Sequence, residues 1–123
     1  MEEKEFRPAE GSCIISEDVI ATIACTAALE VPGVASMATR PADIHGIISG
    51  SAASRSVKVI NNENETIVDV YVNLRLGTRI PDVAGDVQHG VKVAVQSMTG
   101  KPVTRVNVHV AGMAMEEEKS KKA

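Results

Sequence analysis

The side chains that could carry out chemistry are few in this sequence and lie far apart. His45, His89 and His109 fall in three different predicted elements, and none has a Ser or Cys at a spacing typical of nucleophilic catalysis. Asp86 lies three residues before His89, which is the spacing of an exposed pair on one helix face. No residues follow one another at the spacing of metal ligands. We therefore predict no catalytic, cofactor-binding or metal-binding residue and no enzyme activity.

Two further features resemble reactive sites only superficially. The glycine-rich residues 46–51 look like a phosphate-binding loop, but no Lys-Ser or Lys-Thr pair follows them. Cys13 and Cys25 lie twelve positions apart without a CxxC motif, and neither has a basic neighbour that would activate the thiol. We interpret both cysteines as small buried hydrophobic side chains rather than as a disulfide or a redox sensor.

The composition predicts one aliphatic core that is built largely from strands. The chain has 123 residues, of which 44% are hydrophobic and only 2% aromatic, and it contains 17 Val and 10 Ile against 3 Leu. Side chains that branch at Cβ favour strands, and a chain of this length can bury one core without disulfides or metal ions. We therefore expect one folded domain over 10–112, with a flexible arm over 1–9 and a charged tail over 113–123.

Hydrophobic periodicity divides this domain into strands and two helices. Ser16 before two acidic residues predicts a helix start, and Pro32 with Gly33 predicts its end. Residues 80–98 repeat apolar side chains at spacings of three and four, which predicts a second, amphipathic helix. Strands are expected at 11–15, 34–37, 56–60, 66–76 and 103–110, with a hairpin joining the third and fourth. The predicted fold class is α+β: a small mixed sheet, made of the hairpin and flanking strands, covered on one face by two helices.

The alternation of side chains in the hairpin's second arm predicts that the other face of the sheet is open to solvent. If this arm and the last strand are neighbours, their outward side chains form one polar surface with Asp69 among them. Such a surface, with both signs of charge and an aromatic ring, is a candidate docking face. Ordinary solvation explains it equally well, because alternation alone places polar residues there. The candidate partner-binding residues are Tyr71, Asn73, Arg75, Arg105, Asn107 and His109.

Charge and hydropathy exclude several classes of partner. The chain carries 13 Lys and Arg against 16 Asp and Glu, a formal net charge of -3, and it has one Tyr. It therefore lacks the basic surface and the aromatic platform of a nucleic-acid-binding protein. No run of about 18 apolar residues occurs, and the acidic N-terminus does not resemble a secretory signal. We expect a cytoplasmic protein with no nucleic-acid partner and no direct membrane insertion, so that any membrane association goes through a partner.

Six segments, taken together and in this order, resemble a known family. They are GSCIISEDVI at 11–20, EVPGV at 30–34, SVKV at 56–59, IPDVA at 80–84, VQSMTG at 95–100 and VTRVNVHV at 103–110. The series resembles the alkaline shock protein family, the general or envelope stress response proteins of Gram-positive bacteria. The resemblance implies an abundant cytoplasmic protein without defined catalytic residues. It also implies that some members gather at the membrane through an anchoring partner, whereas others are encoded beside lipid-metabolism genes.

Three functions remain open at this point. The leading one is a non-enzymatic stress response protein that forms a homo-oligomer or docks on a protein partner at the cytoplasmic side of the membrane. The alternative is a regulatory binding domain for a lipid-metabolism enzyme or a small metabolite, with the Gly- and Ser-rich loop over 38–54 closing over the ligand. The weakest is a hydrolase that uses His89 or His109, because neither has catalytic partners in the sequence.

Overall fold

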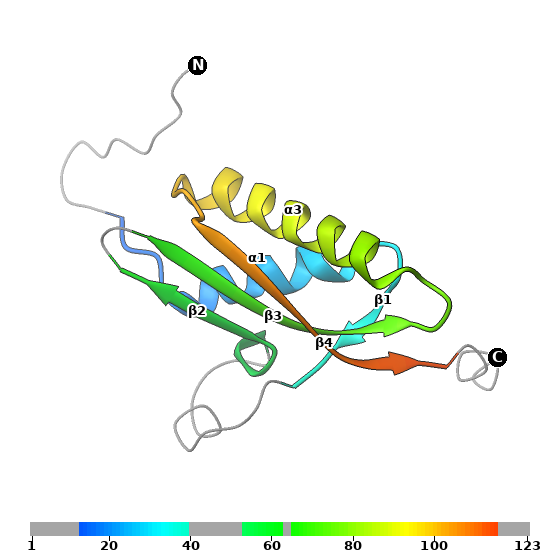
Figure 1. The fold of residues 1–123 in the computed structure, drawn as a ribbon. Helices are drawn as coiled ribbons and strands as arrows, with labels where there is room; N and C mark the ends of the chain where they lie inside the picture. Colours follow the sequence, from blue (N-terminus) through cyan, green and yellow to red (C-terminus); the bar gives the residue numbers. More distant parts are fainter. Residues whose placement is uncertain (1–12, 40–52, 63–64, 116–123) are drawn as a thin grey trace.

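The computed structural model describes residues 13–39, 53–62 and 65–115, and within them it shows two helices packed on one four-stranded sheet (Figure 1). The predicted α+β class is confirmed, as is the hairpin. No helix in these three ranges has both the length and the apolar character that a membrane span requires. Along the chain the elements are α1 (Glu17–Leu29), β1 (Val34–Met37), the 3₁₀ helix η1 (Ala53–Arg55), β2 (Val57–Asn61), β3 (Thr66–Arg75), α3 (Ile80–Thr99) and β4 (Arg105–Ala114).

Strand β3 is the centre of the sheet and is paired along both of its edges. One edge carries β4, which runs parallel to β3 and brings Tyr71 opposite His109. The other edge carries two antiparallel strands, with β2 beside the first half of β3 and β1 beside the second half. The sheet is therefore mixed, as predicted, and the parallel pair is possible because α3 forms the long crossover between β3 and β4.

Local sequence explains where the helices begin and end. The Ser16 side chain accepts a hydrogen bond from the Val19 amide at 3.2 Å, which satisfies one of the free N–H groups in the first turn of α1. Pro81 lies in the first turn of α3, where its missing N–H costs nothing. Gly100 ends α3 in the left-handed conformation, with φ 77°, which glycine adopts without steric cost. The helix start predicted at Ser16 is confirmed.

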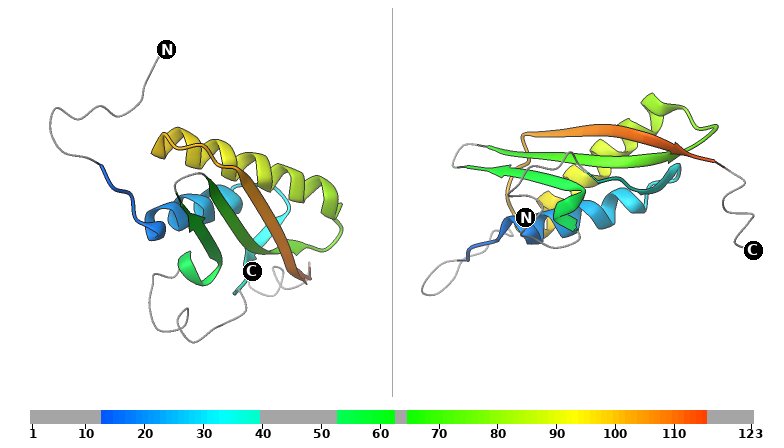
Figure 2. Two further views of the ribbon diagram at one scale, coloured as in Figure 1. Left: turned by 60° about the vertical axis from the view of Figure 1, so that its left-hand side comes forward. Right: turned by 90° about the horizontal axis from the view of Figure 1, so that it is seen from below.

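The core lies between one face of the sheet and the two helices, which cover the same side (Figure 2). From β3 it receives four alternate apolar side chains, which are fully buried. From α3 it receives four valines spaced four apart, as the predicted amphipathic pattern requires. Helix α1 contributes Ile20 and three alanines, which allow the helices to approach each other closely. The residues from β3 and α3 are Val68, Val70, Val72, Leu74, Val83, Val87, Val91 and Val95.

The structure differs from the sequence prediction at two strands. Residues 13–15, which belong to the strand expected at 11–15, form no strand; Ile14 is exposed, and both edges of β3 are already occupied by other strands. Strand β4 continues past Val110 to Ala114 and so takes in two residues assigned to the charged tail. The alternation stops at Val110 because a bulge at Ala111 shifts the register with β3. The expected arm over 1–9, most of the loop over 38–54 and the residues after Met115 lie outside the described residues.

Candidate functional site

The face of the sheet that points away from both helices carries mainly polar side chains, with the apolar pair Ile60 and Ile67 at one end. We define the open face as the outward side chains of all four strands, which alternate with the buried ones. All six residues predicted from the sequence belong to it, so the expected adjacency of β3 and β4 is confirmed. Its members are Ser36, Lys58, Ile60, Ile67, Asp69, Tyr71, Asn73, Arg75, Arg105, Asn107 and His109.

Tyr71 and His109 form the centre of the open face. They are opposite each other across the β3–β4 pair, and their rings stack with centroids 4.3 Å apart and planes 8° apart. The direct opposition of two residues on neighbouring strands makes this contact possible. The stack forms a flat, half-exposed platform with a hydroxyl and an imidazole at its rim, which is the type of surface that anchors protein interfaces.

Asp69 connects the two strands beside this platform. Its Oδ1 accepts a hydrogen bond of 2.7 Å from Asn107 Nδ2, and the same oxygen lies 3.9 Å from His109 Nε2. The Asp69 side chain is 16% exposed, whereas that of His109 is 44% exposed. The carboxylate is therefore held in a fixed position by β4, while the imidazole keeps a free surface.

Asn73 extends the open face toward β1. Its Nδ2 donates to Ser36 Oγ at 3.1 Å, and residue 112, opposite Asn73 on β4, is a glycine. A Cβ atom at Gly112 would lie 3.0 Å from Asn73 Oδ1, so the absent side chain leaves room for the asparagine. Because the register with β3 shifts at the bulge, Gly112, and not Ala111, lies opposite Asn73.

Cationic side chains lie toward the two ends of the open face. Arg105 and Lys58 flank the platform on one side, and Arg75 lies at the far end of β3. Within residues 13–39, 53–62 and 65–115, the carboxylate groups form no ion pair with any of these three. The predicted residues thus divide into a central group, Tyr71, Asn107 and His109, and a peripheral group. Sequence reasoning missed Lys58 and Ser36, although the alternation of 56–60 could have placed Lys58 outward.

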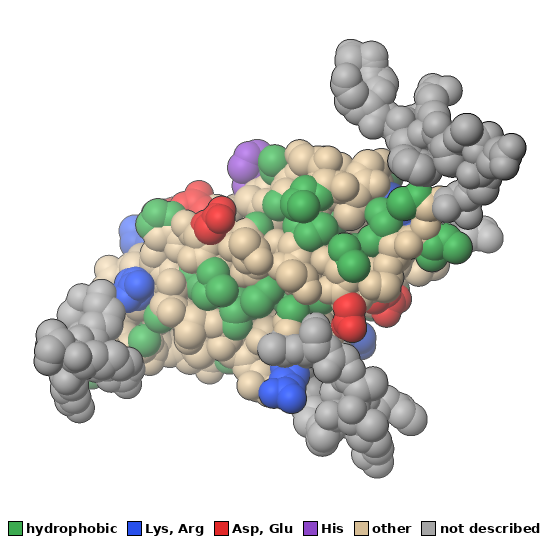
Figure 3. Space-filling model, turned by 180° about the vertical axis from the view of Figure 1, so that it is seen from behind, with side chains coloured by type: hydrophobic (Ala, Val, Ile, Leu, Met, Phe, Trp, Pro, Cys, Tyr) green, Lys and Arg blue, Asp and Glu red, His purple; other side chains and the backbone are tan. Residues whose placement is uncertain are grey.

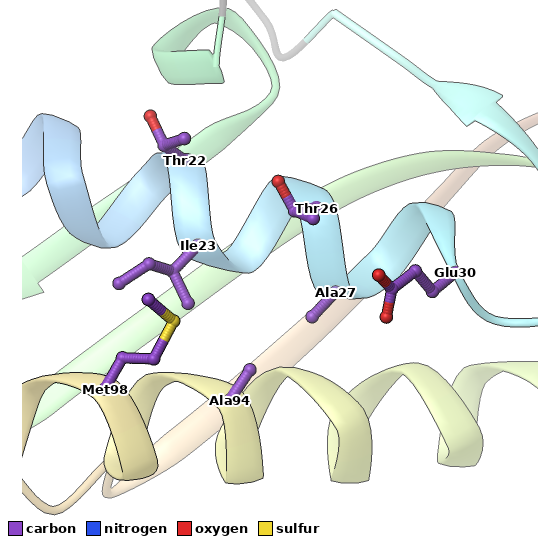
Figure 4. A pocket seen from close by; sticks show the side chains of 7 residues that line it. All are labelled: Thr22, Ile23, Thr26, Ala27, Glu30, Ala94 and Met98. Carbon is purple, nitrogen blue, oxygen red and sulfur yellow. The ribbon is translucent and has the colours of Figure 1, made fainter.

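The opposite side of the molecule has a different character, with scattered apolar side chains and few charges (Figure 3). A shallow groove of about 320 Å³ lies between α1 and α3. Ile23 and Ala27 of α1 point toward Ala94 and Met98 of α3 across this groove (Figure 4). Its lining contains no cluster of groups that could perform catalysis.

The remaining chemistry-bearing residues do not converge on a site. In the part of the chain that the structure describes, no group of three or more His, Cys, Asp or Glu side chains could hold a metal ion. Asp86 and His89 are both exposed on α3, as their spacing predicted. Cys25 packs against the core, and its partial burial raises the pKa of its thiol. The prediction that both cysteines are buried is wrong for Cys13, which is exposed because residues 13–16 form no strand against the core.

The sequence of the chain is similar to those of proteins from Bacillus subtilis and Streptococcus pyogenes. The chain is 34% identical to the uncharacterized protein YloU of Bacillus subtilis over 112 residues, which are 89% of this chain and 93% of the relative. It is 33% identical to YqhY of the same organism, over 84% of this chain and 77% of the relative. It is 30% identical to Spy1535 of Streptococcus pyogenes, over 87% and 82% of the two chains.

Solved structures show a more distant likeness. MamM CTD in a manganese form superposes with a TM-score of 0.48 at 14% identity, over 79% of this chain and 99% of that one. A zinc form gives a TM-score of 0.45, also at 14% identity, over 84% and 89% of the two chains. The sequence comparison is far more specific: the model of the alkaline shock protein 23 family, described as having a cell envelope-related function, matches residues 5–115. By this match over most of its length, the chain belongs to that family, the alkaline shock proteins that its six segments resemble.

Proposed function

We propose that this protein is a non-enzymatic docking module that binds another protein through its open face. The observation that carries the proposal is the stacked pair of Tyr71 and His109, which is held beside a fixed carboxylate on a rigid sheet. An ordinary solvated strand does not need two stacked rings, whereas Tyr and Arg are the residue types that most often dominate binding energy at interfaces. The sheet holds these groups in place before binding, so that little conformational entropy is lost when a partner docks.

The charge of the open face supports a protein partner of complementary sign. Asp69 is already hydrogen-bonded by Asn107, whereas Lys58, Arg75 and Arg105 keep their charges available. A partner that presents carboxylates around an apolar centre would match this arrangement. The family description, a cell envelope-related function, agrees with a partner anchored at the membrane and with a cytoplasmic position for this chain. Recruitment to the envelope is then the role of the partner.

The alternative function, a regulatory domain for a lipid-metabolism enzyme or a small metabolite, depends on the loop over 38–54. Most of this loop lies outside the described residues, so the alternative stays a prediction. The groove between α1 and α3 gives it no support, because its walls lack the convergent polar groups of a metabolite site.

A binding experiment with matched variants tests the proposal. The immobilised protein captures its partner from a lysate of cells that express it, and the purified partner is then titrated against three proteins. These are the wild type, Tyr71→Ala/Arg75→Ala on the open face, and Lys92→Ala/Met98→Ala on the opposite side. Each double variant removes one cation and one large side chain from exposed or half-exposed positions.

We expect at least a tenfold weaker dissociation constant for the open-face variant and no change for the control. Circular dichroism checks that both variants remain folded. Equal affinity of all three proteins for the partner would overturn the proposal.

A further inference from the structure

The groove between α1 and α3 is longer than the part lined by Ile23 and Met98. A second hollow, of about 370 Å³, continues it, and the two hollows share Ala27, Glu30 and Ala94. The residues that only the second hollow contributes are Val31, Pro32, Asp86, His89, Gly90 and Val93. The two hollows therefore form one continuous channel, which we call the interhelix groove.

The shape of the interhelix groove matches a helix. Residue numbers rise in opposite directions along α1 and α3 where the two helices border it (Figure 4), so the helices are antiparallel. Along α3 the groove extends from Asp86 to Met98, which is about 18 Å at a rise of about 1.5 Å per residue. A strip of this length between two helices can receive about three turns of a third one, and an apolar groove is a common receptor of an amphipathic helix.

The walls of the interhelix groove are apolar and incompletely buried. Met98 is 71% exposed and Val93 is 46% exposed. Ile23, Ala27 and Ala94 are half-buried. Figure 3 shows apolar side chains over much of this side of the molecule. A helix laid in the groove would remove these surfaces from water, which favours binding.

The charged side chains of the interhelix groove are acidic and lie at one end of it. Glu30 and Asp86 both line the second hollow, and the described residues that line the two hollows include no Lys or Arg. Both residues are exposed, and within the described ranges neither carboxylate has an ion pair or a hydrogen-bond partner. Helix α1 ends here without a basic residue in its last turn, so the negative end of its dipole adds to the two carboxylates. The groove therefore has an acidic end beside Glu30 and an uncharged end beside Met98.

Gly90 leaves the wall of the groove open beside the acidic end. A Cβ atom at this position would meet Val31 Cγ2 at 3.9 Å, which is an ordinary contact, so packing within the described chain does not require a glycine. Inside a helix a glycine costs about 1 kcal/mol relative to alanine. What the missing side chain does supply is space, because another backbone can approach α3 most closely where a residue has no Cβ.

The charges of the groove decide between different occupants. An anionic membrane surface would be repelled by Glu30 and Asp86. A helix of a second copy lacks the complementary charge, since α1 contains no Lys or Arg and α3 contains only Lys92. A helix that carries Lys or Arg at one end and apolar side chains along one face fits both ends of the groove.

We propose that the interhelix groove binds an amphipathic helix of another protein, with Lys or Arg side chains at one end of that helix. Its apolar side chains, spaced three and four apart, contact Ile23, Ala94 and Met98, and its cations lie beside Glu30 and Asp86. The occupant is therefore recognised by an apolar stripe and a basic end together.

Binding in the interhelix groove is independent of the open face, which lies on the other side of the sheet. The proposal goes beyond the proposed docking function and does not rest on it. The two double variants that test the open face should exchange roles here. Tyr71→Ala/Arg75→Ala should bind a helix in the groove like the wild type, whereas Lys92→Ala/Met98→Ala should bind it more weakly. This exchange distinguishes a failure of one proposal from a failure of the other.

Fluorescence anisotropy with a synthetic probe tests the proposal on the full chain. The probe is a labelled peptide of about 16 residues, with Leu at spacings of three and four and Lys in its last turn. A matched peptide carries Glu in place of each Lys. We expect saturable binding of the basic peptide and a dissociation constant at least about tenfold higher for the acidic one. Absence of saturable binding of the basic peptide, or equal affinity for both peptides, overturns the proposal.

A matched pair of glycine variants locates the binding site. Gly90→Gln places a side chain in the groove, whereas Gly85→Gln makes the same change on α3 outside it, where no atom lies within 4 Å of the added Cβ. Both replace a helical glycine with a better helix former, so both should remain folded, which circular dichroism checks. We expect about a tenfold loss of affinity for the basic peptide in Gly90→Gln and none in Gly85→Gln. Equal affinities of the two variants contradict the proposal.

A matched pair of charge variants tests the acidic end. Glu30→Gln/Asp86→Asn removes the two carboxylates of the groove, and Glu17→Gln/Glu65→Gln removes two that do not line it, so the net charge of both variants is the same. We expect about a tenfold loss of affinity for the first variant only. An equal loss in both would mean that the peptide responds to net charge, and the proposal would fail.

Sedimentation velocity of the glycine variants without peptide tests a second copy as the occupant. We expect the wild type, Gly85→Gln and Gly90→Gln to sediment alike. If the first two form an oligomer that Gly90→Gln does not form, a second copy covers the groove and the proposal is overturned.

Discussion

The two faces of β3 are made by the same ten residues and yet have opposite roles. On the covered face, Val68, Val70, Val72 and Leu74 are fully buried against two helices. On the open face, Asp69, Tyr71 and Asn73 contact side chains of the neighbouring strands. The covered face draws its stability from a large buried apolar area, whereas each contact on the open face contributes little.

If the open face is the docking surface that we propose, stability and recognition are separable in this protein. A change on the covered face removes the fold and everything that depends on it, whereas a change on the open face alters a surface while the core remains. The following predictions test that separation, beginning with the largest expected effect.

Val70→Asp should unfold the domain. Val70 is fully buried beneath the helices, where a carboxylate would find no partner, and we expect a loss of about 4 kcal/mol or more. The matched control is Tyr71→Asp, the next residue along the strand, which loses only the ring stack and should cost about 1 kcal/mol. Thermal melts followed by circular dichroism measure both. A Val70→Asp protein that melts like the wild type would reverse the assignment of the faces.

Alanine at Gly33 should be more harmful than alanine at Gly112. At Gly33, φ is 102° and a Cβ atom would lie 2.8 Å from Val83 Cγ2 of α3, so both backbone and packing oppose it. We expect a loss of about 2 kcal/mol. At Gly112 the only close atoms belong to the Asn73 side chain on the open face, which can rotate away, and we expect less than about 1 kcal/mol. Urea titrations of both variants decide the order.

Asp69→Ala should destabilise the domain by about 1 kcal/mol, because it leaves the half-buried Asn107 amide without its acceptor. Asp69→Asn keeps an oxygen in the same place and should cost less than about 0.5 kcal/mol. The comparison is made by urea titration. Equal losses for the two variants would mean that the charge, and not the hydrogen bond, holds β3 and β4 together at this position.

The smallest expected effect is the coupling between the stacked rings. A double-mutant cycle of Tyr71→Ala and His109→Ala should give an interaction energy of about 0.5 kcal/mol, because the pair is half-exposed. A coupling above about 2 kcal/mol would show that the open face also supports the fold, and it would weaken the separation between the two faces.

Much of this fold could be predicted from the sequence because its signals are local. Ser16, Pro81 and Gly100 mark helix ends through backbone chemistry that acts within one turn, and the alternation of β3 directly reflects burial on one side. The expected strand at 11–15 is wrong because an apolar run forms a strand only where the fold brings it beside a sheet edge, and residues 13–15 lead into α1 without pairing with any strand. That constraint is global and leaves no local trace.

Only the part of the candidate site that depends on local signals could be predicted from the sequence. Alternation indicated the outward residues of β3 and β4, but the exact register of a parallel pair is set by packing against α3 and does not appear in the sequence. The opposition of Tyr71 to His109 and the hydrogen bond from Asn107 to Asp69 therefore required the structure. The bulge at Ala111, which shifts the register between β3 and β4, also had no local signal beyond the glycine that follows it.

The parallel pairing of β3 with β4 has a consequence for how the protein is made. Asp69 and Asn107, the two ends of the hydrogen bond across the open face, are 38 residues apart, and β4 follows β3 and α3 along the chain. Until β4 has been synthesised, β3 has one bare edge, Tyr71 has no ring to stack on and half of the open face does not exist. A partner that bound the open face, as we propose, would therefore recognise only chains in which β4 is already in place.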